Sequence, residues 1–440
     1  MLKNFLLVGG FNSMPLSRLI IRLMTLILLM LTAHTASAIQ PRLPEMNALP
    51  DQTSISGLSS GAFMASQFHV AYSEDMVGAA IIAGGPWNCA STFSWLSPLN
   101  NALTSCMDPC KYTWFICPAW FFPNGSDLAV QAKDAVAAGE IDDVSNLLDD
   151  KVYIFSGRND DTVVTGVVDA TQAFYRALGL PDEHIFYNKG IDAGHAFITN
   201  DASDAPCDVT QSPYINNCNI AQARRLLTHI YGELNEAPAL SPIAEKITEH
   251  AVEPEAEAAQ AAEPEAEAAQ AAEPVLQGEL IRFNQKEFLE TDNTSMDDDA
   301  YVYIPQSCET QQCRVHVSLH GCRQGISVIG TTYIDETGYN EVADNNNLII
   351  LYPQVKKSSV NPVNPRGCWD FWGYTSANLP PFKYAQKDAP QMKAIKKMID
   401  RLTSSDQSAD KPATTESVPS ESVSSGLAPS ESTQLPAVTE

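Results

Sequence analysis

The chain has few basic residues for its size, and it lacks a long apolar run. Its 27 Lys and Arg residues face 53 Asp and Glu residues, which gives a formal net charge of -26 at pH 7. Because no basic surface is available to neutralise phosphates, this balance argues against a nucleic-acid partner. No apolar run reaches the roughly 20 residues that span a bilayer, so we expect no stable membrane insertion.

The cysteines do not group as metal ligands do. The closest pairs, Cys106 with Cys110 and Cys308 with Cys313, lack the second His or Cys pair that a zinc site needs. We therefore expect no metal site. The chain has 10 cysteines, and an even number in an exported chain indicates disulfides.

Residues 1–38 are typical of an export signal. Arg18 and Arg22 precede a short apolar run, and an Ala-Ser-Ala site at 36–38 closes the segment. Met14 is an alternative start of translation. We expect the protein to be secreted or periplasmic.

The composition divides the rest of the chain into four segments. Residues 39–235 and 276–402 carry the patterns of structured halves. Residues 236–275 form an acidic linker rich in Ala, Pro and Glu, and one ten-residue unit from Glu253 recurs there without change. Residues 403–440 are rich in Ser, Thr, Pro and Glu. We expect the linker and the tail to be disordered and the two halves to form one catalytic domain.

The stretch around Ser59 predicts a strand, a sharp turn and a helix. A β-type run at 53–56 leads into Gly-Leu-Ser-Ser-Gly at 57–61, and a helical pattern follows. This is the context of a G-x-S-x-G nucleophile elbow, in which the glycines allow a crowded turn and the serine hydroxyl stays exposed above the sheet. Ser59 is then the candidate nucleophile. The alternative is an ordinary turn rich in Gly and Ser.

A nucleophilic serine needs an acid and a base, and two later loops offer them. Asp160 follows a predicted strand at 151–157, where α/β-hydrolases place the acid that orients the catalytic histidine. The spacing favours Asp160 over Asp161, although either aspartate alone is typical of a turn. His195 lies in a loop between two small residues, which let its ring approach a serine.

Strand and helix patterns alternate through both halves. They predict an α/β fold with a mostly parallel sheet flanked by helices. A predicted strand at 313–319 ends in His-Gly-Cys at 320–322, and such an ending is where an α/β-hydrolase builds part of its oxyanion hole. This strand and a final helix at 389–402 usually precede the nucleophile strand, but here they come last. We therefore expect a circularly permuted α/β-hydrolase whose halves complete one sheet.

The segment at 87–124 differs from the rest of the first half. It holds four cysteines and a cluster of aromatic residues, among them Trp95 and Trp120. It is either a disulfide-pinned cap that adds apolar wall to a substrate site or an insertion that buries its own aromatics.

Five motifs together resemble those of one family. They are Gly-Leu-Ser-Ser-Gly-Ala-Phe-Met-Ala at 57–65, Phe-Ser-Gly at 155–157 with Asp160, Ala-Gly-His-Ala-Phe at 193–197, Leu-His-Gly-Cys-Arg-Gln at 319–324, and Asn-Pro-Arg-Gly-Cys-Trp-Asp-Phe-Trp-Gly-Tyr at 364–374. In these motifs the chain resembles the circularly permuted, single-domain poly(3-hydroxybutyrate) depolymerases. The acidic linker and tail depart from the compact form of that family.

The resemblance implies an exported serine esterase that hydrolyses poly(3-hydroxybutyrate) or a related short-chain polyhydroxyalkanoate. It implies Ser59, Asp160 and His195 as the catalytic triad, and the backbone amides of Ser60 and Cys322 as the oxyanion hole. The expected partner is the polyester substrate and the expected state is a monomer. Neither a metal nor another cofactor is required.

Three further expectations rest on the same motifs. Trp369 or Trp372 is expected to form part of an aromatic wall of the substrate crevice, and Cys322 is expected to pair with Cys368 because both lie in motifs that converge on the site. Two other functions stay open. One is a related esterase for soluble esters such as feruloylated sugars, and the other is a non-catalytic polyester-binding protein, against which a complete triad speaks.

Overall fold

The structure is a computed structural model that describes residues 41–111, 117–235, 276–376 and 382–405. The expected export signal, the acidic linker and nearly all of the expected tail lie outside the described residues. Within these ranges no helix is both long enough and apolar enough to cross a membrane.

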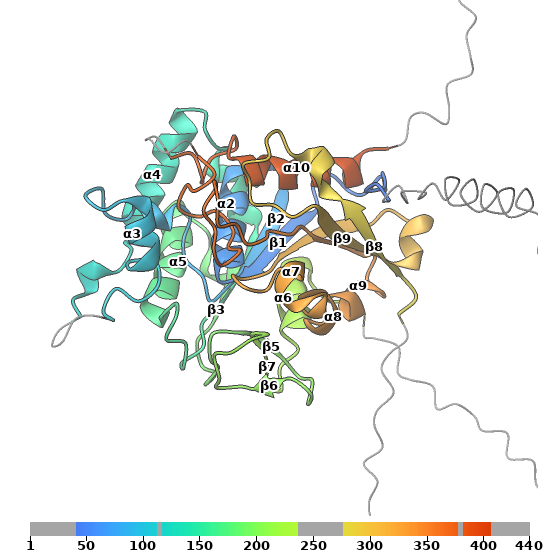
Figure 1. Ribbon diagram of the computed structural model, residues 1–440, viewed down its shortest axis with the longest axis horizontal. Coiled ribbons are helices and arrows are strands. Elements are labelled where there is room, and N and C mark those ends of the chain that lie inside the picture. Colours follow the sequence, from blue (N-terminus) through green and yellow to red (C-terminus); the bar gives the residue numbers. More distant parts are fainter. Residues whose placement is uncertain (1–40, 112–116, 236–275, 377–381, 406–440) are drawn as a thin grey trace, which may run out of the picture.

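An eight-stranded sheet runs through the described residues and takes strands from both halves of the chain (Figure 1). In spatial order its strands are β4 (Ile185–Asn188), β3 (Lys151–Phe155), β2 (Met76–Ile82), β1 (Thr53–Leu58), β10 (Arg314–Leu319), β11 (Leu348–Tyr352), β9 (Asp299–Ile304) and β8 (Glu279–Asn284). All neighbours from β4 to β11 are parallel, whereas β9 and β8 pair antiparallel at one edge. The predicted mostly parallel α/β sheet is confirmed.

Helices cover both faces of this sheet (Figure 1). One face carries α2 (Ser60–Ala71), α4 (Gly125–Ala137), α5 (Thr165–Leu178) and α10 (Pro390–Thr403), and the other carries α6 (Gln222–Tyr231), α7 (Ile326–Ile329), α8 (Thr332–Glu336) and α9 (Tyr339–Ala343). Successive strand residues alternate between the faces, so each strand contributes side chains to the hydrophobic core on either side of the sheet. In β11, Ile349 and Leu351 pack with the first group of helices, and Ile350 and Tyr352 pack with the second.

The inner strands of the sheet are rich in apolar residues, since both of their faces are buried. In β11 all five residues, Leu-Ile-Ile-Leu-Tyr, are buried, and such continuous apolar runs are typical of parallel strands under helices. The runs predicted as strands at 53–56, 151–157 and 313–319 correspond to β1, β3 and β10.

A second, smaller sheet follows the loop that contains His195. It consists of β5 (Phe197–Thr199), β7 (Ile215–Asn217) and β6 (Ala205–Pro206), and the Cys207–Cys218 disulfide lies beside it. The sequence patterns did not predict this sheet, because strands of two or three residues are too short to show a period of two.

The segment at 87–124 is held by two disulfides, Cys89–Cys106 and Cys110–Cys117, and contains the short helix α3 (Pro98–Leu103). Trp87 is buried and donates its indole N–H to Ala385 O at 2.9 Å. Trp95 and Trp120 are 72% and 66% exposed. The segment therefore buries only part of its aromatic surface.

Candidate active site

Ser59 lies at the turn between β1 and α2, where the backbone is strained. Its φ of 57° and ψ of -120° place a residue with a Cβ in a region that such residues avoid, at a cost on the order of 1–3 kcal/mol. The turn is held because Ser59 N donates to Ile82 O at 3.0 Å and Ser59 O accepts from Ala62 N at 2.9 Å. These contacts turn the side chain away from the strand.

The two glycines of the motif are required by close packing. A Cβ on Gly57 would lie 2.3 Å from the backbone of Gly61, and a Cβ on Gly61 would lie 2.4 Å from Leu319 O on β10. Larger residues would push α2 away from the sheet. The crowded turn predicted from the sequence is therefore present at Ser59.

The loops that carry the other candidates meet at the same edge of the sheet. Since β1, β2, β3 and β10 are parallel, their carboxyl ends lie together, and this is where α/β sheets place their ligands. The loops after β1, β3 and β10 bring Ser59, Asp160 and Cys322 to that edge.

Asp160 and His195 form a buried pair. His195 Nδ1 lies 2.7 Å from Asp160 Oδ2, and the side chains are buried. The other carboxylate oxygen, Oδ1, accepts from Thr162 N and Val163 N, both at 2.9 Å. Asp161 is exposed. An acid fixed by backbone donors and bonded to Nδ1 holds the imidazole with Nε2 free to act as a base.

Two backbone N–H groups near Ser59 have no acceptor among the described residues. They belong to Ser60, the first residue of α2, and to Cys322. The loop after β10 lies against the elbow, since a Cβ on Gly321 would be 3.3 Å from Ser59 Cβ. Paired amides of this kind are what an oxyanion hole uses.

Ser59, Ser60 and Cys322 line one cavity, which we call the elbow cavity, with a volume of about 580 Å³. Its wall is mostly apolar and includes Leu99 and Leu103 of α3. Val163 lines the cavity and also binds Asp160 through its backbone N–H, so the Asp160–His195 pair lies directly beside it.

No hydrogen bond joins Ser59 Oγ to the His195 ring among the described residues. Catalytic hydrogen bonds of this kind are often long without substrate and tighten in the complex.

The two candidate tryptophans differ in position. Trp372 lines the elbow cavity beside Phe371, and their rings meet edge to face at 4.9 Å between centroids. Trp369 is fully buried, and its backbone N–H donates to Ser60 Oγ at 3.2 Å. Trp372 therefore lies at the wall of the cavity, whereas Trp369 lies in the core.

The sequence reasoning missed the residue that anchors this wall. Asp370 is buried, and its carboxylate accepts backbone N–H bonds from Trp372, Gly373, Tyr374 and Thr375. Burial raises the pKa of Asp370, whereas the hydrogen bonds from Thr375 and its neighbours lower it. These hydrogen bonds hold the loop in a conformation in which Phe371 and Trp372 line the cavity. Its only sequence signal is an acid between two aromatic residues.

The predicted pairing of Cys322 with Cys368 is confirmed. This disulfide joins the loop after β10 to the aromatic loop, and both cysteines line the elbow cavity. All five disulfides join described cysteines, the remaining one being Cys308–Cys313. Among the described residues no group of three or more His, Cys, Asp or Glu side chains is arranged to hold a metal ion.

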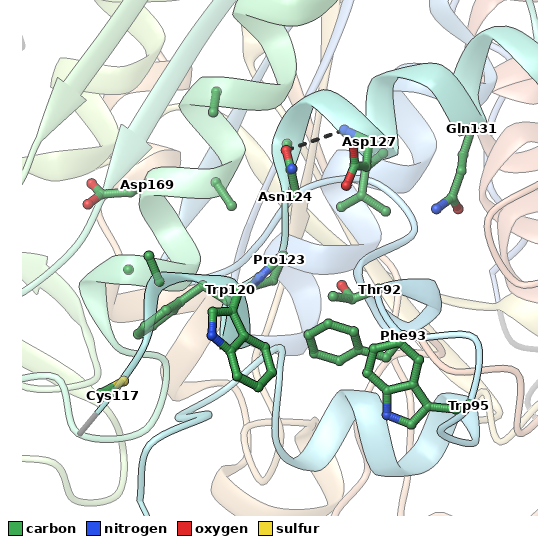
Figure 2. Close-up of a pocket in the computed structure, with 17 residues that line it drawn as sticks. Thr92, Phe93, Trp95, Cys117, Trp120, Pro123, Asn124, Asp127, Gln131 and Asp169 are labelled. Carbon is green, nitrogen blue, oxygen red and sulfur yellow. Dashed lines mark hydrogen bonds between the residues drawn. The ribbon is translucent and has the colours of Figure 1, made fainter. Parts of the chain in front are cut away.

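A second cavity, which we call the cap cavity, has a volume of about 1020 Å³ and lies between the 87–124 segment and helices α4 and α5. Figure 2 shows Trp120 on one side of it and Phe93 with Trp95 on the other. None of the candidate catalytic residues lines it.

Comparisons with known proteins confirm the resemblance to poly(3-hydroxybutyrate) depolymerases that the five motifs indicate. A poly(3-hydroxybutyrate) depolymerase of Delftia acidovorans is 38% identical over 366 residues, which cover 82% of this chain and 62% of that protein. The chain thus spans less than two thirds of the Delftia protein. A polyhydroxybutyrate depolymerase of Talaromyces funiculosus is 33% identical over 377 residues, covering 82% of this chain and 92% of that protein.

Two solved structures are similar in fold. They are the PHB depolymerase from Penicillium funiculosum and a serine-to-alanine variant of a PHB depolymerase complexed with an R3HB trimer. Each is 31% identical with a TM-score of 0.63, and each match covers 82% of this chain and 99% of the other. No family model matches the chain.

Proposed function

The chain belongs to the poly(3-hydroxybutyrate) depolymerase family, and from that premise we propose that it is an exported serine esterase that hydrolyses this polyester or a related short-chain polyhydroxyalkanoate. The observation that carries the proposal is the meeting of Ser59, Ser60 and Cys322 in one apolar cavity beside the buried Asp160–His195 pair.

We propose Ser59 as the nucleophile, His195 as the base and Asp160 as the acid that orients it. His195 Nε2 takes the proton of Ser59 Oγ as the oxygen attacks an ester carbonyl, and Asp160 stabilises the imidazolium that forms. His195 then gives that proton to the departing alcohol of the polymer. Water, activated by the same histidine, hydrolyses the 3-hydroxyacyl enzyme and restores Ser59.

The amides of Ser60 and Cys322 are proposed to stabilise the tetrahedral oxyanion. Each such donor is worth on the order of 10²–10³ in rate when it is held in place before the reaction. The apolar wall with Leu99, Leu103 and Trp372 suits the aliphatic backbone of a polyester, and no metal or organic cofactor has a step in this reaction.

We also propose that the chain order is circularly permuted and that the enzyme works outside the cytoplasm as a monomer. The position of β1 between β2 and β10, parallel to both, supports the permuted order, because β10 comes after β1 in the chain but beside it in the sheet. The disulfides support export, since they persist in oxidising compartments.

The substrate class can be tested by comparing turnover of polyester films, feruloylated sugars and simple aryl esters by the purified enzyme. We expect release of 3-hydroxybutyrate from films and little turnover of the feruloylated sugar, which the comparisons do not favour. Fluorophosphonate labelling separates out the non-catalytic alternative, because an inert polyester-binding protein would stay unlabelled.

A further inference from the structure

His320 is buried directly behind the loop that carries Cys322. It follows the last residue of β10, and its ring packs against Trp369 and Tyr333, with centroids 5.7 and 6.3 Å away. The side chain has no place in the proposed proton transfers, and it does not line the elbow cavity.

Both ring nitrogens of His320 are used, and their partners fix the tautomer. Nδ1 lies 2.7 Å from Gly321 O, which can only accept, so Nδ1 carries the hydrogen. Nε2 lies 3.3 Å from Val355 N, which can only donate, so Nε2 is the acceptor. Burial lowers the pKa of His320 to about 4, so the ring is neutral near pH 7 and this arrangement holds.

The bond to Gly321 O determines where the Cys322 amide points. Gly321 O and Cys322 N–H belong to the same peptide unit, which is planar and trans, so they point in opposite directions. A donor that holds Gly321 O toward the interior therefore directs Cys322 N–H away from His320, toward the cavity that Cys322 lines.

The preceding peptide is also held. Gly321 N donates to Gln324 Oε1 at 2.6 Å, and Gln324 Nε2 donates to Pro213 O at 2.8 Å. Gly321 O also accepts from Gln324 N, but at 3.3 Å against 2.7 Å from His320 Nδ1, so His320 supplies the shorter of the two bonds that set the rotation of the Cys322 peptide.

We propose that His320 is a positioning residue of the oxyanion hole: through the Nδ1–H bond to Gly321 O it holds the Cys322 N–H in the orientation that donates to the oxyanion. The inference rests on the proposed function, since it assigns a role within that reaction. The proposal gives the two ring nitrogens different roles. Nδ1 binds the peptide whose N–H contacts the transition state, whereas Nε2 accepts from Val355 N.

Two substitutions of His320 test the two nitrogens in turn. His320→Asn places an amide N–H near the position of Nδ1 and leaves Val355 N without its partner. His320→Gln places its amide near Nε2, where the carbonyl can accept from Val355 N, and leaves Gly321 O only the longer bond from Gln324 N. Each variant loses one buried hydrogen bond, so their losses of stability should be similar.

With p-nitrophenyl butyrate as substrate, we expect His320→Gln to lower kcat by about 10- to 100-fold with KM within about threefold, since a misdirected donor mainly loses transition-state binding. We expect His320→Asn to keep kcat within about threefold of wild type. Inhibition by butylboronic acid, whose tetrahedral adduct on serine mimics the oxyanion, should weaken in parallel with kcat/KM in His320→Gln only.

A matched control is His316, which is buried on the same strand and bonded by both ring nitrogens to Ser54 and Ser56 at 2.6 and 2.7 Å. His316→Asn should lower the melting temperature and keep kcat within about twofold, because these serines do not touch the cavity. A fall in kcat as large as that of His320→Gln would overturn the proposal, because it would show a general response to damage in β10.

Equal kcat in His320→Asn and His320→Gln would also overturn it. Where a variant does not fold, ¹⁵N NMR of the wild-type histidine rings decides: the Nδ1–H tautomer of His320 supports the proposal and the Nε2–H tautomer contradicts it. Wild-type enzyme that is inactive toward the ester would refute the proposed function, whereas an active wild type with an equally active His320→Gln would refute only the positioning role.

Discussion

The elbow cavity and the cap cavity differ in which of their polar groups lack hydrogen-bond partners. The cap cavity is the larger, at about 1020 Å³ against about 580 Å³, and it carries the more exposed tryptophans. Two of its polar side chains already have partners: Gln131 binds Asn88 and Ser91, and Asp169 binds Tyr187 and Lys189.

In the elbow cavity two of the unpaired polar groups are backbone amides that the surrounding structure holds in place. The Ser60 amide is the first of α2, and the Cys322 amide follows Gly321, whose N–H and C=O are both bonded. The comparison teaches that the proposed site lies where parallel strands end and leave oriented groups without partners, and that neither volume nor aromatic content marks that place.

The largest effect is expected from the base. His195→Ala should lower kcat for p-nitrophenyl butyrate by about 10⁴-fold or more, and Ser59→Ala with His195→Ala together should be no worse than either alone, because the triad acts as a unit. Steady-state kinetics of the two single variants and the double variant measure this. If the fold-loss of kcat in the double variant equals the product of the two single losses, the residues do not act as a unit. That result would also weaken the distinction between the two cavities.

The acid should come next. Asp160→Asn is expected to lower kcat by roughly 10⁴-fold, since the amide no longer holds the imidazole in the working tautomer. Asp161→Asn is the matched control, because this exposed neighbour makes no bond to His195. If Asp161→Asn proved the more damaging of the two in the same assay, the acid would be reassigned.

The Cys322–Cys368 disulfide at the elbow cavity and the Cys89–Cys106 disulfide of the 87–124 segment should differ in how much they stabilise the fold. Cys322–Cys368 closes a separation of 46 residues and Cys89–Cys106 one of 17. The chain-entropy model gives about 4 and about 3 kcal/mol, so Cys322→Ala with Cys368→Ala should cost the more in denaturant unfolding. The folded variant should keep most of its kcat, because the donor at residue 322 is the backbone N–H.

A larger loss of stability on removal of Cys89–Cys106 than on removal of Cys322–Cys368 would reverse this part of the comparison. Loss of turnover without loss of stability in the folded variant would mean that the disulfide is needed to hold the Cys322 amide in place, beyond its effect on stability.

The smallest effect is expected at the cap cavity. Trp95→Ala and Trp120→Ala should leave kcat/KM for a soluble ester within about twofold and the free energy of unfolding within about 0.5 kcal/mol, since both rings are largely exposed. Trp372→Ala should raise KM for the same ester, because this ring lines the elbow cavity. A fall in ester turnover with Trp120→Ala as large as that with Trp372→Ala would break the distinction.

The sequence could predict the elbow and the large sheet because their requirements are local. Gly57 and Gly61 are needed by contacts across one turn, and the buried strands leave continuous apolar runs. Asp160 followed from its distance to the preceding strand. The pairing of Cys322 with Cys368 followed from two motifs expected to converge.

The remaining features depend on contacts between distant parts of the chain. The sequence shows Trp369 and Trp372 in one motif but not which of them faces the cavity. The bond of His320 to Val355 appears only once β10 and β11 lie side by side. The anchoring of that loop by Asp370 is local, but its sequence signal is only an acid between two aromatic residues. The small β5–β7 sheet is missed because its strands are too short to carry a pattern.

The most direct test of the account measures 3-hydroxybutyrate released from amorphous poly(3-hydroxybutyrate) by wild-type enzyme and by Ser59→Ala, with both proteins shown to be folded by circular dichroism. The account predicts sustained release by the wild type. The variant should release product at no more than about a few per cent of that rate, because the acyl-enzyme cannot form without the serine oxygen. Release by Ser59→Ala at a rate comparable to wild type would contradict it, since the reaction would then proceed without the group around which the elbow cavity is built.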